Sequence, residues 1–133
     1  MPTLKQGDTV LFQGDSITDA GRNREVDTDT GKGYVYLASS QYASRHPEHQ
    51  ITFLNRGLGG HTVKALRDRW EADCLNLKPS VVSILVGIND NRMAGTENKS
   101  QSMDEFERIL HKLHTDGWFI NVSLYASRRI LLV

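Results

Sequence analysis

A serine, a glycine and an asparagine stand in three short polar clusters, and each cluster directly follows an apolar run. The hydroxyl of Ser16 is a potential nucleophile, and the backbone N–H of Gly60 can be approached closely because no side chain shields it. The side-chain amide of Asn89 is a further hydrogen-bond donor. A serine beside preorganised donors is what acyl transfer requires, since the donors stabilise the developing oxyanion. The clusters are Gly-Asp-Ser-Ile-Thr-Asp at 14–19, Arg-Gly-Leu-Gly-Gly-His at 56–61 and Gly-Ile-Asn-Asp at 87–90.

Four apolar runs indicate strands that would position these clusters. The first three are rich in β-branched and large apolar residues and end at a glycine-containing cluster, which is typical of strands buried on both faces of a parallel sheet. The runs cover residues 9–13, 51–55, 80–86 and 119–125, and we also consider a continuation of the last run into 129–133.

Helical patterns lie between the apolar runs. One face of the first pattern carries Tyr34, Leu37, Ala38 and Tyr42, and Pro47 is expected to end that helix. The second pattern is marked by Val63, Leu66, Trp70 and Leu77, and the third by Met103, Phe106, Ile109, Leu110 and Leu113.

The alternation of strands and helices predicts an α/β fold with a parallel sheet and helices on its faces. At 133 residues, the chain is expected to form one domain over residues 1–133. Because the carboxyl ends of parallel strands meet at one edge, all three polar clusters should lie there, at the usual ligand crevice. The polar segment 19–32 should form a loop that is either functional or a mobile cover.

The three clusters together resemble the conserved blocks of the GDSL (SGNH) hydrolases. Residues 11–19 resemble the first block, with isoleucine where the family name has leucine, while 55–60 and 87–90 resemble the second and third. The resemblance implies a three-layer αβα fold with a flavodoxin-like sheet and hydrolysis of acyl esters or thioesters. It also implies that Ser16 is the nucleophile, with the N–H groups of Ser16 and Gly60 and the Asn89 side chain as the oxyanion hole. Residues 11–24 are most similar to carbohydrate acetylesterases.

The general base of this family lies in an Asp-x-x-His block, and no such spacing occurs in the 133 residues. We therefore expect the chain to be the N-terminal portion of such a domain, truncated before that block and weak or inactive as an enzyme. The alternative is a non-catalytic remnant of the same fold that binds a ligand. His61 is the best substitute base, although an exposed loop residue is the more common role for such a histidine. Asp15 and Asp90 are expected to support the turns through local hydrogen bonds.

Composition argues against nucleic acid and a membrane as partners. Equal numbers of acidic and basic residues give no net charge to attract nucleic acid, and no run approaches the ~18 apolar residues of a membrane span. No signal peptide is visible, so the expected location is cytoplasmic and the expected partner is a small ester substrate.

No cofactor or metal is expected: His46 and His49 are assigned to a surface turn, and His111 and His114 to a solvated helical face. Cys74 is expected to be a buried small hydrophobe.

Overall fold

The computed structural model describes residues 4–93, 108 and 120–124, and within them four parallel strands form one sheet. The order across the sheet is β2-β1-β3-β4, so that β1 and β3 are flanked on both sides. The strands are β1 (Thr9–Gly14), β2 (Thr52–Asn55), β3 (Val81–Val86) and β4 (Ile120–Leu124). The predicted parallel α/β sheet and its four strands are confirmed.

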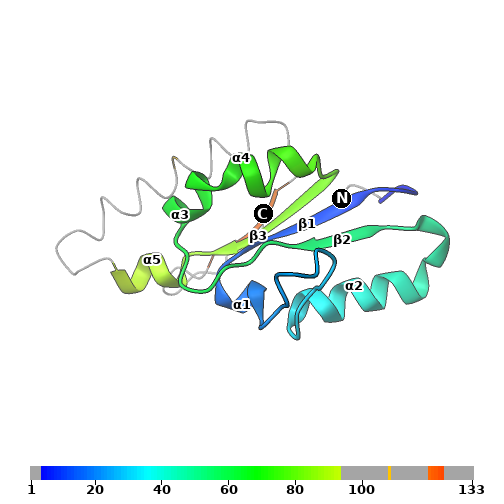
Figure 1. Cartoon of the computed structure of the whole chain (residues 1–133), viewed down its shortest axis with the longest axis horizontal. Helices are drawn as coiled ribbons and strands as arrows, with labels where there is room; N and C mark the ends of the chain where they lie inside the picture. Colours follow the sequence, from blue (N-terminus) through cyan, green and yellow to red (C-terminus); the bar gives the residue numbers. More distant parts are fainter. Residues whose placement is uncertain (1–3, 94–107, 109–119, 125–133) are drawn as a thin grey trace.

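Successive residues of β1 bury opposite faces of the sheet, which produces two apolar layers. Leu11 packs in the larger cluster under α3 (Val63–Asp68) and α4 (Trp70–Asp73), whereas Val10 and Phe12 pack in a second cluster against α2 (Tyr34–Arg45). Figure 1 shows α3 and α4 on one side of the strands and α2 with the short helix α1 (Ser16–Asp19) on the other. The three-layer arrangement is therefore confirmed.

The predicted apolar face of α2 is wrong in part. Leu37 is 67% exposed and Ala38 is also exposed, whereas Val35 and Ser39 are buried. The rotation of the helix is set by Tyr34. Its ring packs edge-on against the ring of Phe12 in β1, and its hydroxyl lies 3.0 Å from the Oγ1 of Thr18 in α1. The helix ends at Arg45, before the proline, as predicted.

The second helical pattern is divided into three short elements rather than one helix. Thr62 caps α3 by accepting a hydrogen bond from the Ala65 N–H at 3.2 Å. The helical path breaks at Arg69, which adopts φ −106° and ψ 8° between α3 and α4, and η2 (Leu75–Leu77) follows. Cys74 is fully buried, as expected. Of the four residues that marked the pattern, Val63, Leu66 and Trp70 are buried, and Leu77 is partly buried against the same cluster.

The remaining described elements are short. A single 3₁₀ turn, η1 (Pro47–His49), connects α2 to β2, and α5 (Ile88–Met93) follows β3. None of the helices described in residues 4–93 is long and apolar enough to cross a membrane. Of the predicted helix around 103–113 only residue 108, which is helical, is described, and the continuation into 129–133 lies outside the described residues.

Candidate active site

The first polar cluster forms a tight turn from β1 into α1. Asp15 is the N-cap of α1, and its carboxylate accepts the Ile17 N–H at 3.0 Å. Burial raises the pKa of Asp15, whose side chain is 1% exposed. A Cβ on Gly14 would lie 2.3 Å from the Leu85 carbonyl oxygen, so only glycine fits where the chain leaves the strand. The turn leaves Ser16 exposed at the start of α1.

The second cluster runs beside the first. The Leu58 N–H donates to the Gly14 carbonyl at 3.1 Å, so the backbone hydrogen bonding between β1 and β2 continues beyond the strands. A Cβ on Gly57 would approach the backbone nitrogen of Asp19 to 2.3 Å, whereas one on Gly59 would meet only the Cβ of Ser16, at 3.9 Å. Gly60 follows, exposed and with φ +78°, a conformation that favours glycine.

The third cluster is joined to the second by side-chain hydrogen bonds. The Asn89 Nδ2 donates to the carbonyl of His61 at 3.0 Å. The Asp90 carboxylate accepts the Val63 N–H at 3.1 and 3.2 Å, at the first residue of α3. Burial raises the pKa of Asp90, and the charge of Asp15 raises it further.

The sheet therefore brings the three predicted clusters together at the carboxyl edge of β1, β2 and β3. Ser16 and Gly60 are exposed, and Asn89 is half-buried beside them. The arrangement places a hydroxyl, a conformationally unusual backbone N–H and an amide donor in one hydrogen-bonded region, which can serve acyl transfer.

Asn55, at the end of β2, links the segments around this region. Its side chain is fully buried, and its Nδ2 donates to the carbonyls of Thr18 at 2.6 Å and Thr30 at 2.9 Å. Its Oδ1 accepts the Gly57 N–H at 2.8 Å. One amide thus joins α1, the polar loop and the second cluster.

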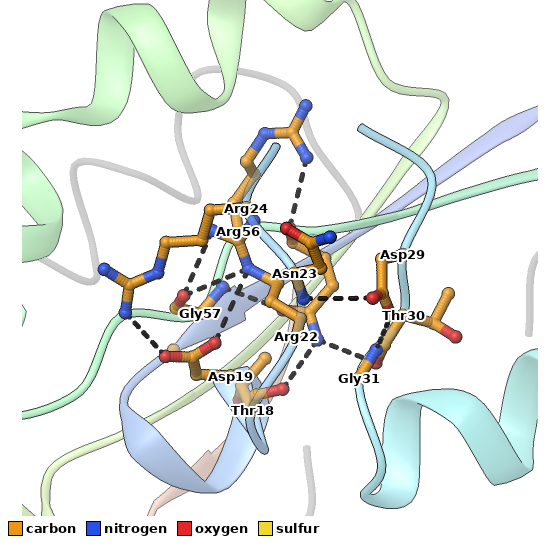
Figure 2. A network of polar contacts seen from close by, with 12 residues as sticks. Thr18, Asp19, Arg22, Asn23, Arg24, Asp29, Thr30, Gly31, Arg56 and Gly57 are labelled. Carbon is orange, nitrogen blue, oxygen red and sulfur yellow. Dashed lines mark hydrogen bonds and ion pairs between the residues drawn. The ribbon is translucent and has the colours of Figure 1, made fainter. Parts of the chain in front are cut away.

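The polar loop, residues 20–33, is held on the first two clusters by arginines (Figure 2). Arg22 donates to the Gly57 carbonyl at 3.3 and 3.4 Å and lies 3.7 Å from the Asp19 carboxylate. Arg24 contacts the other oxygen of Asp19 at 2.7 Å. Arg56, from the second cluster, pairs with the loop carboxylate of Asp27. Burial lowers the pKa of Arg22, and the charge of Asp19 opposes this effect.

Arg69 holds the turns from the other face of the sheet. Its guanidinium donates to the carbonyls of Gly14 at 3.1 Å and Arg56 at 2.7 Å, which belong to the first and second clusters. The same group donates to the buried side chain of Gln13 at 2.7 Å and contacts the Asp73 carboxylate at 3.1 Å. Its position in the break between α3 and α4 allows a charged side chain to reach backbone oxygens at the ends of β1 and β2.

His61, the candidate substitute base, is also held by Arg69. The Arg69 Nε–H donates to His61 Nδ1 at 3.2 Å, and burial together with the positive charge of Arg69 lowers the pKa of His61. A neutral imidazole that accepts at Nδ1 carries its proton on Nε2, so neither ring nitrogen offers a free lone pair. His46 precedes η1 and His49 ends it, in the turn before β2 at the opposite end of the sheet, and His111 and His114 lie outside the described residues.

Sequence reasoning assigned no role to Asn55, Arg69 or Arg22. A signal was present for two of them: Arg69 lies three residues after Leu66 and next to Trp70, on an otherwise apolar helical face, and Asn55 ends an apolar strand. Charged or amide side chains in such positions are buried only with partners. Nothing in the loop pattern distinguished Arg22 from its charged neighbours.

The sequence profile of the GDSL-like lipase/acylhydrolase family matches residues 12–127, which include all three clusters. The chain belongs to this family. An acetylxylan esterase from Geobacillus stearothermophilus is 38% identical over 118 residues, covering 83% of this chain and 54% of the esterase. The GDSL chain described here therefore spans about half the length of that relative.

Solved structures of family members share the fold. A protein of Parabacteroides merdae assigned as a GDSL-like lipase superposes with a TM-score of 0.80 and 35% identity, over 90% of this chain and 60% of that one. The acetylxylan esterase of Geobacillus stearothermophilus superposes with a TM-score of 0.78 and 34% identity, over the same shares. The GDSL hydrolases are carboxylic ester hydrolases, so the family of this chain is one of enzymes.

Proposed function

We propose that Ser16 is the nucleophile of an acyl-ester hydrolase and that its oxyanion hole comprises the Ser16 and Gly60 N–H groups and the Asn89 side chain. The observation that carries the proposal is the direct hydrogen bonding among the three clusters at one sheet edge, with the serine exposed. Asn89 uses one N–H of its Nδ2 on the His61 carbonyl, which orients the amide, and the second N–H is a donor for substrate.

The reaction would proceed through an acyl-enzyme. The Ser16 Oγ attacks the ester carbonyl, its proton passes to a base, and the three donors stabilise the oxyanion. The alcohol leaves with that proton. Water then attacks the acyl-serine, and the carboxylic acid is released.

The proposed base is a histidine of the whole protein that an aspartate orients, not His61. The geometry at His61 supports this assignment, because Arg69 occupies its Nδ1. Two solved structures of the Geobacillus esterase are of catalytic variants, one with an aspartate and one with a histidine replaced by alanine. By analogy, such a pair would supply the base here.

The proposed substrates are O-acetyl esters of carbohydrates. The support is the 38% identity to an acetylxylan esterase over most of this chain. The exposed position of Ser16 suits a bulky alcohol moiety, because the nucleophile is not enclosed within the sheet edge.

An aryl acetate assay with chemical rescue tests the serine mechanism in the 133-residue chain. We expect slow hydrolysis, because an oxyanion hole and binding alone give roughly 10³–10⁴-fold acceleration over water. Added imidazole should increase the rate by serving as the base, beyond its own reaction with the ester. Ser16→Ala should abolish the rescue but keep the slow rate, which the oxyanion hole and binding supply without the serine hydroxyl.

The matched control is Ser44→Ala, at an exposed serine of α2 that donates to the Gln41 carbonyl. This variant should behave as wild type. Equal rates in Ser16→Ala and wild type in the presence of imidazole would reject the serine mechanism and leave a ligand-binding domain. Robust turnover that is lost in both Ser16→Ala and His61→Ala would instead make His61 the base.

A further inference from the structure

The turn between α2 and β2 brings two imidazoles and a carboxylate together. His46, Glu48 and His49 each present a metal-ligating atom, and these atoms all lie within 4.8 Å of one another. Pro47 starts the 3₁₀ turn that places the first and last of these side chains on one side. The turn takes no part in the site around Ser16.

Two of the three ligand distances already fit a tetrahedral ion. With metal–ligand bonds of ~2.0–2.1 Å, the ligand atoms of a tetrahedral zinc site lie about 3.3–3.4 Å apart. The distance from His46 Nδ1 to Glu48 Oε1 is 3.4 Å, and that from His49 Nε2 to the same oxygen is 3.6 Å. The carboxylate oxygen therefore stands at ligand distance from both imidazoles.

The third distance, between the ligating nitrogens of His46 and His49, requires one imidazole to turn. The two rings are stacked with their planes 13° apart, and the lone pairs of ligands in parallel rings cannot meet at one ion. The side chain of His46 is 45% exposed and that of His49 27%, so His46 can turn towards the carboxylate while His49 keeps its place.

Tyr42 would orient the more buried imidazole. Its hydroxyl oxygen lies 2.9 Å from His49 Nδ1. When Nδ1–H donates to that oxygen, the lone pair is on Nε2, the nitrogen that faces Glu48. Ligating histidines in metal sites are held by this kind of second hydrogen bond. The tyrosine hydroxyl thus stands where it can accept from Nδ1–H in the tautomer that a metal site needs.

We propose that His46, Glu48 and His49 form a Zn²⁺ site with water as the fourth ligand. Two imidazoles and one carboxylate suit Zn²⁺ and neighbouring borderline ions, whereas Mg²⁺ and Ca²⁺ prefer oxygen ligands alone. The backbone contributes no ligand, so the site depends on these three side chains.

The site's role is structural, because it lies far from Ser16. The Gly7 N–H donates to the His49 carbonyl at 2.8 Å, which places the turn beside the beginning of β1, whereas Ser16 follows its end. A strand of 6 residues spans roughly 20 Å. The bound ion would join the C-terminal end of α2 to the start of β2. At a free ion concentration of 100 times Kd, the folding equilibrium constant should rise about 100-fold.

Calorimetric titration of the untagged 133-residue chain with Zn²⁺ tests the site, with thermal melting as a second measurement. We expect one ion per chain and a melting temperature raised by roughly 10 °C at 100 times Kd. Mg²⁺ should give neither effect. Glu48→Gln should abolish binding while leaving the metal-free melting temperature unchanged, because the Glu48 side chain is 63% exposed. Tyr42→Phe should weaken binding about 10- to 100-fold.

The matched control is the double variant His111→Ala and His114→Ala, which removes the other closely spaced histidine pair. It should bind Zn²⁺ as wild type does. Binding that persists in Glu48→Gln and His49→Ala, or that disappears in the double variant, would overturn the proposal. A Zn²⁺ titration without heat or melting shift in wild type would overturn it as well.

Discussion

Replacing Asn55 by leucine should be among the most destabilising single substitutions in this chain. The side chain is fully buried and makes three hydrogen bonds to backbone groups, of which those to Thr18 and Gly57 are buried and that to Thr30 is part-buried. Leucine fills the space, so water cannot replace the lost amide, and all three backbone groups lose their partner.

The magnitude follows from these three bonds. A buried polar group without a partner costs about 1–3 kcal/mol, and a part-buried hydrogen bond contributes about 1 kcal/mol. Burial of the leucine side chain returns about 1.5–3 kcal/mol. The net loss in the free energy of unfolding should be about 1–4 kcal/mol, a large part of the ~5–15 kcal/mol typical of domains.

Urea unfolding followed by tryptophan fluorescence measures this loss, because Trp70 is buried in the larger apolar cluster. The matched control is Asn76→Leu at an exposed position of η2, which should change stability by less than about 0.5 kcal/mol. A loss below about 1 kcal/mol in Asn55→Leu would refute the reasoning that this amide joins the three segments.

Three further predictions concern the same region. Arg69→Met should lower the free energy of unfolding by about 2–4 kcal/mol in urea titrations, because the Arg56 carbonyl, the buried Gln13 Oε1 and the Asp73 carboxylate each lose the guanidinium as a partner. A change within about 0.5 kcal/mol would contradict this. Gly57→Ala should destabilise by at least about 1–3 kcal/mol, because its Cβ would lie 2.3 Å from the backbone nitrogen of Asp19, whereas Gly59→Ala should unfold as wild type does. For Asp15, the raised pKa means that the folded state holds a proton which the unfolded chain has released, so stability falls as the pH rises from about 4 through the raised folded value. Asp15→Asn keeps the helix cap and removes this dependence; its stability relative to wild type should therefore increase from about pH 4 to about pH 7, and a constant difference would contradict the assignment.

The sheet and the meeting of the polar clusters were predictable because they depend on patterns that are visible in the amino-acid sequence itself. Each strand is a continuous apolar run, and parallel topology alone brings the segments after Gln13, Asn55 and Val86 to one edge. No contact had to be known for that inference. The structural relatives confirm the fold.

The errors arose where contacts between elements decide the outcome. In α2, the faces through Tyr34 and through Val35 are about equally apolar, and the contacts of Tyr34 with the sheet and with α1 decide which one is buried. The break at Arg69 exists because its guanidinium bonds to carbonyls of two distant turns, which no local helical pattern encodes. The His46 cluster depends on a turn whose side-chain placement is likewise absent from the pattern.

Mass spectrometry of the chain after treatment with a reactive aryl phosphonate in imidazole buffer tests the assignment of Ser16 most directly. The account predicts one adduct per chain, located by peptide mapping on Ser16, with equal labelling in Ser44→Ala and none in Ser16→Ala. An adduct on another residue, or labelling that persists in Ser16→Ala, would contradict the assignment of Ser16 as the nucleophile.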